Sequence, residues 1–169
     1  MIQRVVGAAL AALLLISCSK DGQPPESAAV VGAVEEASMS LDFQASSMLN
    51  PGPTGQPAPV RVRIYELKNT AGFTRADYFA LAERAQATLG ADLIDQDEVL
   101  LQPGEQLTVR RSLAPATRHV GLVVGYREID QAQWRTVLDV APRQTSNYQI
   151  SLAARAIGSA TSAPSRPAP

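Results

Sequence analysis

The sequence contains few residues that could carry chemistry, and its single cysteine has the most informative position. Cys18 stands at the end of an apolar run from Val5 to Ile16, and this run follows Arg4. A disulfide needs a second cysteine, and a zinc site needs more than the one Cys and one His present. A positive start followed by a short apolar stretch is typical of an export signal. The position of Cys18 therefore indicates processing of the chain.

The residues Leu15-Ile16-Ser17-Cys18 resemble a bacterial lipobox. This resemblance implies a diacylglyceryl group on the Cys18 thiol, cleavage that removes the signal peptide 1–17, and acylation of the new amino group. Several acyl chains anchor a protein stably, whereas a single chain binds membranes only marginally. Ser19 stands where an Asp is typical of inner-membrane retention. We therefore expect a lipid-anchored protein of the outer membrane that faces the periplasm.

Two alternatives for this segment stay open. One is an ordinary signal peptide that is cleaved elsewhere and carries an incidental cysteine. The other is an uncleaved membrane anchor, although a transmembrane helix takes roughly 20 apolar residues and this run is shorter. The register of the apolar run with Ser17 and Cys18 favours lipidation over both.

The other residues that could do chemistry lack partners in the sequence. His119 is the sole imidazole, and it comes at the start of a predicted strand without a nucleophile motif such as G-x-S-x-G. Four acidic residues fall between positions 92 and 98, but they lack the spacing and the glycine of an EF-hand: Asp92, Asp95, Asp97 and Glu98. We expect a structural or solvated histidine and a solvated acidic turn, with no catalytic residues, no metal and no cofactor beyond the lipid.

The composition places limits on the possible partners. The formal net charge is -1 and the pI is about 5.8, so no basic stripe supports binding to nucleic acid. Residues 18–36 begin with Pro, Gly, Ser and charged residues, and they are predicted to form a flexible tether. Residues 158–169 are of low complexity and are predicted to be a disordered tail. One domain, 37–157, lies between them.

Within this domain, the dominant hydrophobic period is two. Each alternating segment can bury one face and expose the other, as antiparallel strands do. Several short strands separated by turn residues predict a mainly β protein, a two-sheet β-sandwich. The seven segments are SMSLDFQA (38–45), PVRVRI (59–64), EVLLQ (98–102), EQLTVRRSL (105–113), HVGLVVGYR (119–127), WRTVLDV (134–140) and NYQISLA (147–153).

One segment has a helical period instead. Residues 74–89 are predicted to form an amphipathic helix, inserted between strands and packed on the sandwich. Thr74 and Asp77 fit a capping box, in which each side chain satisfies a backbone N–H group at the start of the helix. Gly90 fits the left-handed residue that ends a helix.

The loop between the first two predicted strands is the strongest candidate for a binding site. It runs from residue 46 to residue 59, whereas most hairpin loops have about 2 to 5 residues. Its prolines stiffen it, which lowers the entropy lost on binding, and Met48 and Leu49 are apolar side chains that could insert into a partner. A mobile surface loop without a role is an equally open interpretation.

Four strings in this order together resemble the TssJ family, outer-membrane lipoproteins of bacterial type VI secretion systems. They are LNPGPTGQPAPVRVRIYEL, FTRADYFAL, LGADLIDQDEVLLQPGE and HVGLVVGYREIDQAQWR. The resemblance covers roughly Leu41 to Val140 and implies a transthyretin-like sandwich with an added helix. It also implies a structural role, in which the protein binds the periplasmic C-terminal region of TssM, an inner-membrane protein, and contacts other subunits of the membrane complex.

In that family the loop between the first two strands contributes to the contact with TssM. The resemblance therefore assigns partner binding to ten consecutive residues: Met48, Leu49, Asn50, Pro51, Gly52, Pro53, Thr54, Gly55, Gln56 and Pro57. Asn50, Pro51, Gly55 and Pro57 match the family pattern. The alternatives are a periplasmic lipoprotein that binds or hydrolyses a small molecule in a transthyretin-like sandwich, and a lipoprotein adhesin.

Overall fold

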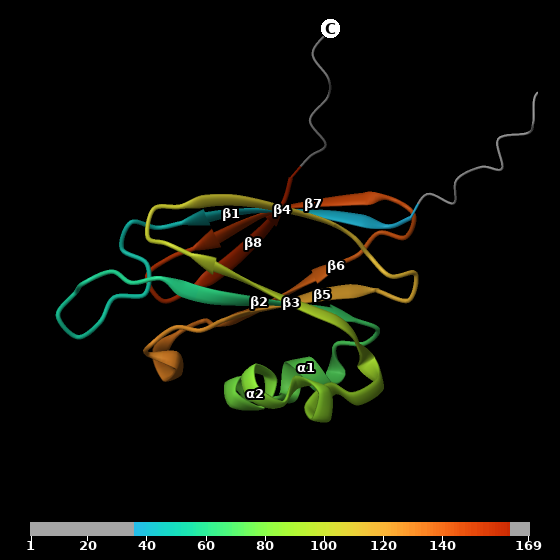
Figure 1. Cartoon of the computed structure of the whole chain (residues 1–169), viewed down its shortest axis with the longest axis horizontal. Helices are drawn as coiled ribbons and strands as arrows, with labels where there is room; N and C mark the ends of the chain where they lie inside the picture. Colours follow the sequence, from blue (N-terminus) through green and yellow to red (C-terminus); the bar gives the residue numbers. More distant parts are fainter. Residues whose placement is uncertain (1–35, 163–169) are drawn as a thin grey trace, which may run out of the picture. The chain divides into compact units, whose positions relative to one another are not determined.

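The computed structural model describes residues 36–162 (Figure 1). The signal peptide, Cys18, the tether up to residue 35 and the tail from residue 163 lie outside the described residues. The elements in chain order are β1 (Ser38–Ala45), β2 (Val60–Leu67), α1 (Ala71–Arg75), α2 (Tyr78–Leu89), η1 (Gly90–Asp92), β3 (Leu93–Leu101), β4 (Gln106–Ser112), β5 (His119–Val124), η2 (Ile129–Gln131), β6 (Arg135–Asp139), β7 (Thr145–Leu152) and β8 (Ile157–Thr161).

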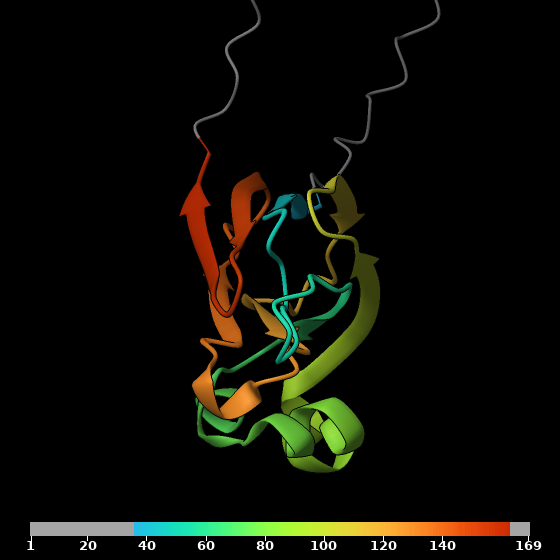
Figure 2. The ribbon, with the colours of Figure 1, turned by 90° about the vertical axis from the view of Figure 1, so that its left-hand side faces the viewer.

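The strands form two layers (Figures 1 and 2), and each layer is a four-stranded sheet. Sheet A has the order β4-β1-β7-β8 and sheet B has the order β3-β2-β5-β6. All neighbours are antiparallel except β1 and β7, which are parallel. The predicted two-sheet sandwich with an inserted helical segment is therefore confirmed.

The main hydrophobic core lies between the sheets and comes from the predicted alternation. Leu41 and Phe43 of β1 are buried against Ile64 of β2 and Leu122 of β5. Their neighbours Asp42 and Gln44 on β1, like Arg61 on β2, face away from this core and are more exposed. Because β1 exposes its other face to solvent, the period of two in its sequence is enough to identify its core-facing side.

A second core lies between the outer face of sheet B and the two helices, which cover this face of the sheet in Figure 1. Phe73 of α1 and Leu81 of α2 pack there on Tyr65 of β2 and Val123 of β5, all of them fully or almost fully buried. The Tyr65 hydroxyl donates to the carbonyl of Leu81, 2.9 Å away, and so ties α2 to the strand below it. β5 in sheet B is thus buried on both faces, which explains its nearly continuous apolar run.

The helical segment differs in detail from the prediction. It begins at Ala71 and breaks between α1 and α2, because Asp77 adopts an extended conformation and its carboxylate accepts from the backbone N–H of Ala80, 2.8 Å away. Asp77 is therefore itself the N-cap of α2. The predicted capping box is wrong, since the Thr74 hydroxyl donates backwards to the carbonyl of Thr70 at 3.0 Å. Gly90 ends α2 with a positive φ of 54°, as predicted, but its ψ of -124° lies outside the left-handed helical region.

Two other predictions need correction. The tail predicted from residue 158 loses its first residues to β8, which pairs with β7. The sequence does not predict this strand, because small residues such as Gly158 and Ser159 give it almost no hydrophobic alternation. Of the four acidic residues predicted in a turn, only Asp92 lies outside a strand, in η1. Asp95, Asp97 and Glu98 lie in β3, because the residues from Asp95 to Val99 pair in register with β2.

The direction of the strands places the ends of the described chain away from the candidate loop. β1 runs from Ser38 towards the loop 46–59, and β7 runs parallel to it from Thr145. β8 returns antiparallel to β7, so that Thr161 pairs with Tyr148. The described chain therefore enters and leaves at one end of the sandwich, called here the terminal end, and the loop 46–59 occupies the other, called here the loop end.

Candidate functional site

Four loops meet at the loop end and are joined by hydrogen bonds. The loop 46–59 accepts at Ser46 from the backbone N–H of Gly104 in the β3–β4 turn, 3.1 Å away. The backbone N–H of Asn50 donates to the carbonyl of Ala154, in the β7–β8 loop, at 3.1 Å. The backbone N–H of Arg127, after β5, donates to the side chain of Asn50 at 2.8 Å. These bonds fix the base of the long loop to three other connections.

Asn50 is the centre of this arrangement. Only 4% of its surface is exposed, and its φ of 48° lies in the left-handed region, which Asn tolerates better than most residues. Its side-chain oxygen accepts from Arg127, and its side-chain nitrogen donates to the carbonyl of Pro59 at 3.0 Å. Leu49 beside it has no exposed surface and belongs to the core between the sheets. Together, the two residues hold the loop in one conformation.

The tip of the loop is a tight turn. The backbone N–H of Gly55 donates to the carbonyl of Gly52 at 2.9 Å, and that of Gly52 donates to the carbonyl of Gln56 at 3.0 Å. Gly55 has a φ of 77°, which a side chain would make costly. Residues 53–56 are exposed, and Met48 keeps 51% of its surface exposed. A stiff, solvated tip therefore projects from a buried base.

The structure divides the ten predicted binding residues into two groups. Those exposed or half-exposed are Met48, Pro53, Thr54, Gly55, Gln56 and Pro57. Those buried in the domain itself are Leu49, Asn50, Pro51 and Gly52. The expectation that Leu49 could insert into a partner is therefore wrong, because this side chain already fills the core of its own domain. The apolar character of Leu49 in the sequence reflects packing.

Charged residues that the sequence did not single out lie beside the loop. The guanidinium of Arg127 reaches over Gly52, where an added Cβ atom would stand 2.8 Å from it. Glu128 forms an ion pair with Arg155 of the β7–β8 loop. Because these three residues are far from the loop in sequence, no local pattern could have placed them at the loop end.

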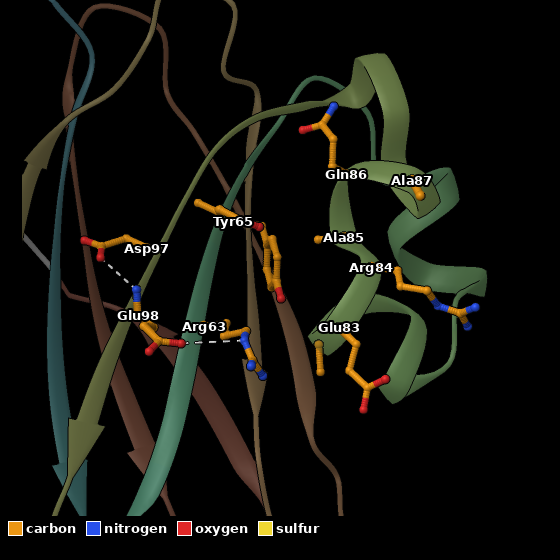
Figure 3. Close-up of a pocket in the computed structure, with 11 residues that line it drawn as sticks. Arg63, Tyr65, Glu83, Arg84, Ala85, Gln86, Ala87, Asp97 and Glu98 are labelled. Atoms are coloured by element: carbon orange, nitrogen blue, oxygen red, sulfur yellow. Dashed lines mark hydrogen bonds and ion pairs between the residues drawn. The ribbon is translucent and has the colours of Figure 1, made fainter.

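A groove of about 550 Å³ lies between α2 and the outer face of strands β2 and β3 (Figure 3). Tyr65 lies between the strands and the helix, and Arg63 forms an ion pair of 3.7 Å with Glu98 at its rim. Arg84 is also among the lining residues, but its side chain extends away from the strands (Figure 3). The lining contains acidic, basic and amide groups but no Ser, Thr, Cys or His, so it does not bring together a nucleophile and a histidine base.

His119 lies at the terminal end, as the first residue of β5. Its Nδ1 atom is 3.0 Å from the Asp139 carboxylate, and the histidine side chain is 31% exposed while that of Asp139 is 87% exposed. Within residues 36–162, no three or more His, Cys, Asp or Glu residues are grouped to hold a metal ion. No helix in this part of the chain is long and apolar enough to cross a membrane.

The comparisons with known proteins agree with this architecture. The family described as type VI secretion lipoprotein, VasD, EvfM, TssJ, matches residues 37–155. The lipoprotein TssJ1 from Pseudomonas aeruginosa is 48% identical with a TM-score of 0.73, and the match covers 79% of this chain and 99% of that chain. Lip from Serratia marcescens, a membrane-bound component of the type VI secretion system, is 26% identical with a TM-score of 0.69, covering 76% of this chain and 99% of that chain.

A chain in a structure of the TssM C-terminal domain from EAEC is 31% identical with a TM-score of 0.63, covering 73% of this chain and 98% of that chain. A comparison with curated proteins gives no match. The fold and these similarities define the class of the protein, a type VI secretion lipoprotein. Within this class, the chain belongs to the TssJ family.

Proposed function

We propose that the protein ties the membrane complex of a type VI secretion system to the outer membrane, by binding the periplasmic C-terminal region of TssM with its loop end. The similarity to a chain in a structure of the TssM C-terminal domain carries this proposal. A further chain, 32% identical, comes from a structure of a type VI membrane complex. The lipid on Cys18 anchors the chain, and the domain presents the loop tip to TssM.

The geometry of the loop end supports this role in two ways. The tip at residues 53–56 projects from a base held by Asn50, so little conformational entropy is lost when a partner binds. The tip also lies at the end opposite to Glu36, from which the chain leads back to Cys18. The anchored end and the binding end of the domain are thus separated by the length of the sandwich.

The test uses the chain from Ser19 to Pro169, made without the lipid, and the C-terminal region of TssM from the same organism. Replacing the whole loop by a tight turn is a poor experiment, because it removes the buried Leu49 and Asn50 and would destabilise the domain. The triple variant Met48→Ala, Thr54→Ala, Gln56→Ala changes only exposed side chains. We expect it to bind TssM at least tenfold more weakly, with an unchanged melting temperature.

Phe79→Ala is the matched control, because Phe79 is 55% exposed, close to the 51% of Met48, and lies on α2 outside the loop 46–59. This variant should bind like the wild type. Equal binding by the triple variant and the wild type would refute the role of the tip, and no binding by the wild type would refute the partner. For the anchor, a Cys18→Ser protein should incorporate no labelled palmitate and should leave the outer-membrane fraction.

A further inference from the structure

The two sheets have four edge strands, and these edges differ in how they are protected. β8 of sheet A and β6 of sheet B lie on the same side of the sandwich, on the left in Figure 2. The hydroxyls of Thr136 on β6 and Ser159 on β8 are 3.3 Å apart, and Gln133 forms an isolated bridge with Ala156 just before the two strands. These two edges cover each other, and the opposite side of the sandwich ends in β3 and β4.

β3 carries the features by which proteins prevent an extra strand from pairing. Asp95, Asp97 and Glu98 give its edge a run of negative charge. In addition, the Asp97 carboxylate accepts from the backbone N–H of Glu98 at 2.7 Å, so this donor is already occupied. An incoming strand would have to break that bond and meet the carboxylates.

β4 has neither an acidic run nor an occupied outward N–H group, although its Arg111 side chain bridges to Asp95 of β3 at 2.8 Å. Its sequence, QLTVRRS, contains no proline, glycine or acidic residue. Two hydrogen bonds flank the pairing of β4 with β1. The Leu113 N–H donates to the Ala37 carbonyl at 2.8 Å, and the Ala45 N–H donates to the Glu105 carbonyl at 2.9 Å, so the backbone groups of Leu113 and Glu105 point towards β1. By the alternation of an antiparallel ladder, four residues turn their N–H and C=O groups away from β1: Gln106, Thr108, Arg110 and Ser112. Among the described residues, these outward N–H and C=O groups have no backbone hydrogen-bond partner.

The side chains of β4 define what kind of strand would fit. Leu107 and Val109 face the other sheet but are only half-buried at the open side of the sandwich. On the opposite face, Arg110 is exposed and forms no ion pair with another described residue. An added strand would cover Leu107 and Val109 with apolar side chains and would complement Arg110 with an acidic one.

The edge of β4 is also continuous with the loop end. β4 starts directly after the turn in which Gly104 donates to the carbonyl of Ser46, at the base of the candidate loop. A partner that covers the loop tip can therefore reach Gln106 without crossing another element. This continuity favours the protein that binds the loop end as the source of the strand.

We propose that the free edge of β4 pairs with an extended segment of the TssM C-terminal region, which has apolar residues on one face and an acidic residue opposite Arg110. This inference rests on the proposed function and extends it from a loop contact to backbone pairing along a strand. Such pairing supplies main-chain hydrogen bonds for affinity, while the alternate side chains supply specificity.

Hydrogen–deuterium exchange on the unlipidated chain from Ser19 to Pro169, with and without the TssM C-terminal region, tests the pairing. We expect the amides of Gln106, Thr108, Arg110 and Ser112 to exchange rapidly in the free protein and at least tenfold more slowly in the complex. Protection confined to the loop 46–59 would overturn the proposal. If the β4 amides of the isolated protein become more protected as its concentration rises, the edge pairs with a second copy of this chain. That result would also overturn the proposal.

Arg110→Pro provides a second test, because it removes an N–H group that points outward and leaves the ladder with β1 in place. Its matched control, Arg110→Gln, removes the charge but keeps the N–H group. We expect the proline variant to bind TssM at least tenfold more weakly and the glutamine variant to lose less. If both variants bind like the wild type, the edge is not used while the proposed function stands; if the wild type does not bind TssM, the proposed function itself fails.

Discussion

The guanidinium of Arg111 on β4 lies 3.1 Å from the carboxylate of Glu66 on β2, so that an ion pair joins the two sheets at the open side of the sandwich. Glu66 is only 2% exposed, and its other oxygen accepts from the Thr117 hydroxyl at 2.7 Å and from the backbone N–H of Ala114 at 3.1 Å. Arg111 also reaches Asp95 at 2.8 Å. One buried carboxylate thus holds the β4–β5 connection, where the chain crosses from one sheet to the other.

The first prediction concerns this carboxylate. Glu66→Ala should lower the free energy of unfolding by about 3–5 kcal/mol, because it leaves two donors without their acceptor and leaves the mostly buried guanidinium with only exposed carboxylates as partners. Urea denaturation followed by circular dichroism measures the change. Asp97→Asn is the matched control, since Asp97 is 3.8 Å from Arg111 and its side chain is 59% exposed; such an exposed pair contributes less than about 1 kcal/mol.

The double variant Glu66→Leu, Arg111→Met tests whether apolar residues at these two buried positions can replace the ion pair. Apolar residues of similar size often replace a buried ion pair without loss of stability. We therefore expect the double variant to be more stable than Glu66→Ala. A double variant that is less stable than the single one would show that the side-chain contacts of Arg111 with Asp95 matter more than the pair itself.

The sheets could be predicted from the sequence because the residues that build them repeat with a period of two. Leu41 and Phe43 alternate with Asp42 and Gln44, and this local pattern alone places one face in the core. The ion pair of Glu66 and Arg111 could not be predicted in this way. The two residues are distant in sequence, and each carries a charge where the alternation calls for an apolar side chain.

The candidate loop was located by its length, but the roles of its residues were only partly predictable. Proline, glycine and length indicated a stiff connection at 46–59. Leu49 packs inward while Met48 remains exposed. This difference depends on contacts with strands that are distant in sequence, so no local pattern predicts it. The partners of Asn50 at Arg127 and Ala154 depend in the same way on the tertiary fold.

The second prediction concerns Asn50, the buried residue at the base of the loop. Asn50→Ala removes the acceptor for Arg127 N–H and the donor to the Pro59 carbonyl, and it places a less tolerant residue at a φ of 48°. We expect a loss of about 2–4 kcal/mol in the free energy of unfolding, from unsatisfied backbone groups and strain. Binding to TssM should weaken even where the domain remains folded, because the tip is no longer held by its base.

Thr54→Ala is the control for this experiment. Thr54 is exposed at the tip of the same loop, so its truncation should change the free energy of unfolding by less than about 0.5 kcal/mol. Comparable stability of the Asn50→Ala and Thr54→Ala proteins would contradict the role of Asn50 as the anchor of the loop.

The third prediction concerns the close approach of α1 to β5. A Cβ atom added at Gly121 would stand 2.6 Å from two ring carbons of Phe73, which is fully buried. Gly121→Ala should therefore cost about 1–3 kcal/mol of stability through overpacking, measured by thermal unfolding. Gly72→Ala is the control, because its added Cβ would stand 3.6 Å from Leu89, an ordinary contact. Adding Phe73→Leu to Gly121→Ala should recover part of the loss, and a simple sum of the two losses would argue against the clash.

The fourth prediction concerns alkaline pH. Burial raises the pKa of Tyr65 to about 12 from the ordinary value of 10.0, and burial also raises the pKa values of Tyr126 and Tyr148. In the unfolded chain these phenols ionise near their ordinary pKa, whereas the folded state keeps them neutral. The stability from the neutral phenols is therefore complete below pH 10 and is lost as the pH rises through about 12.

Denaturant unfolding at a series of pH values, together with the ultraviolet absorbance of the phenolate, measures this loss. For Tyr65 alone the shift corresponds to about 2–3 kcal/mol. Tyr65→Phe cannot ionise, so its free energy of unfolding should fall less steeply over this range, although it also loses the hydrogen bond to the Leu81 carbonyl at every pH. If the wild type and Tyr65→Phe lose stability in parallel between pH 10 and about 12, the buried phenol of Tyr65 contributes nothing to the alkaline transition. Another titratable group would then control this transition.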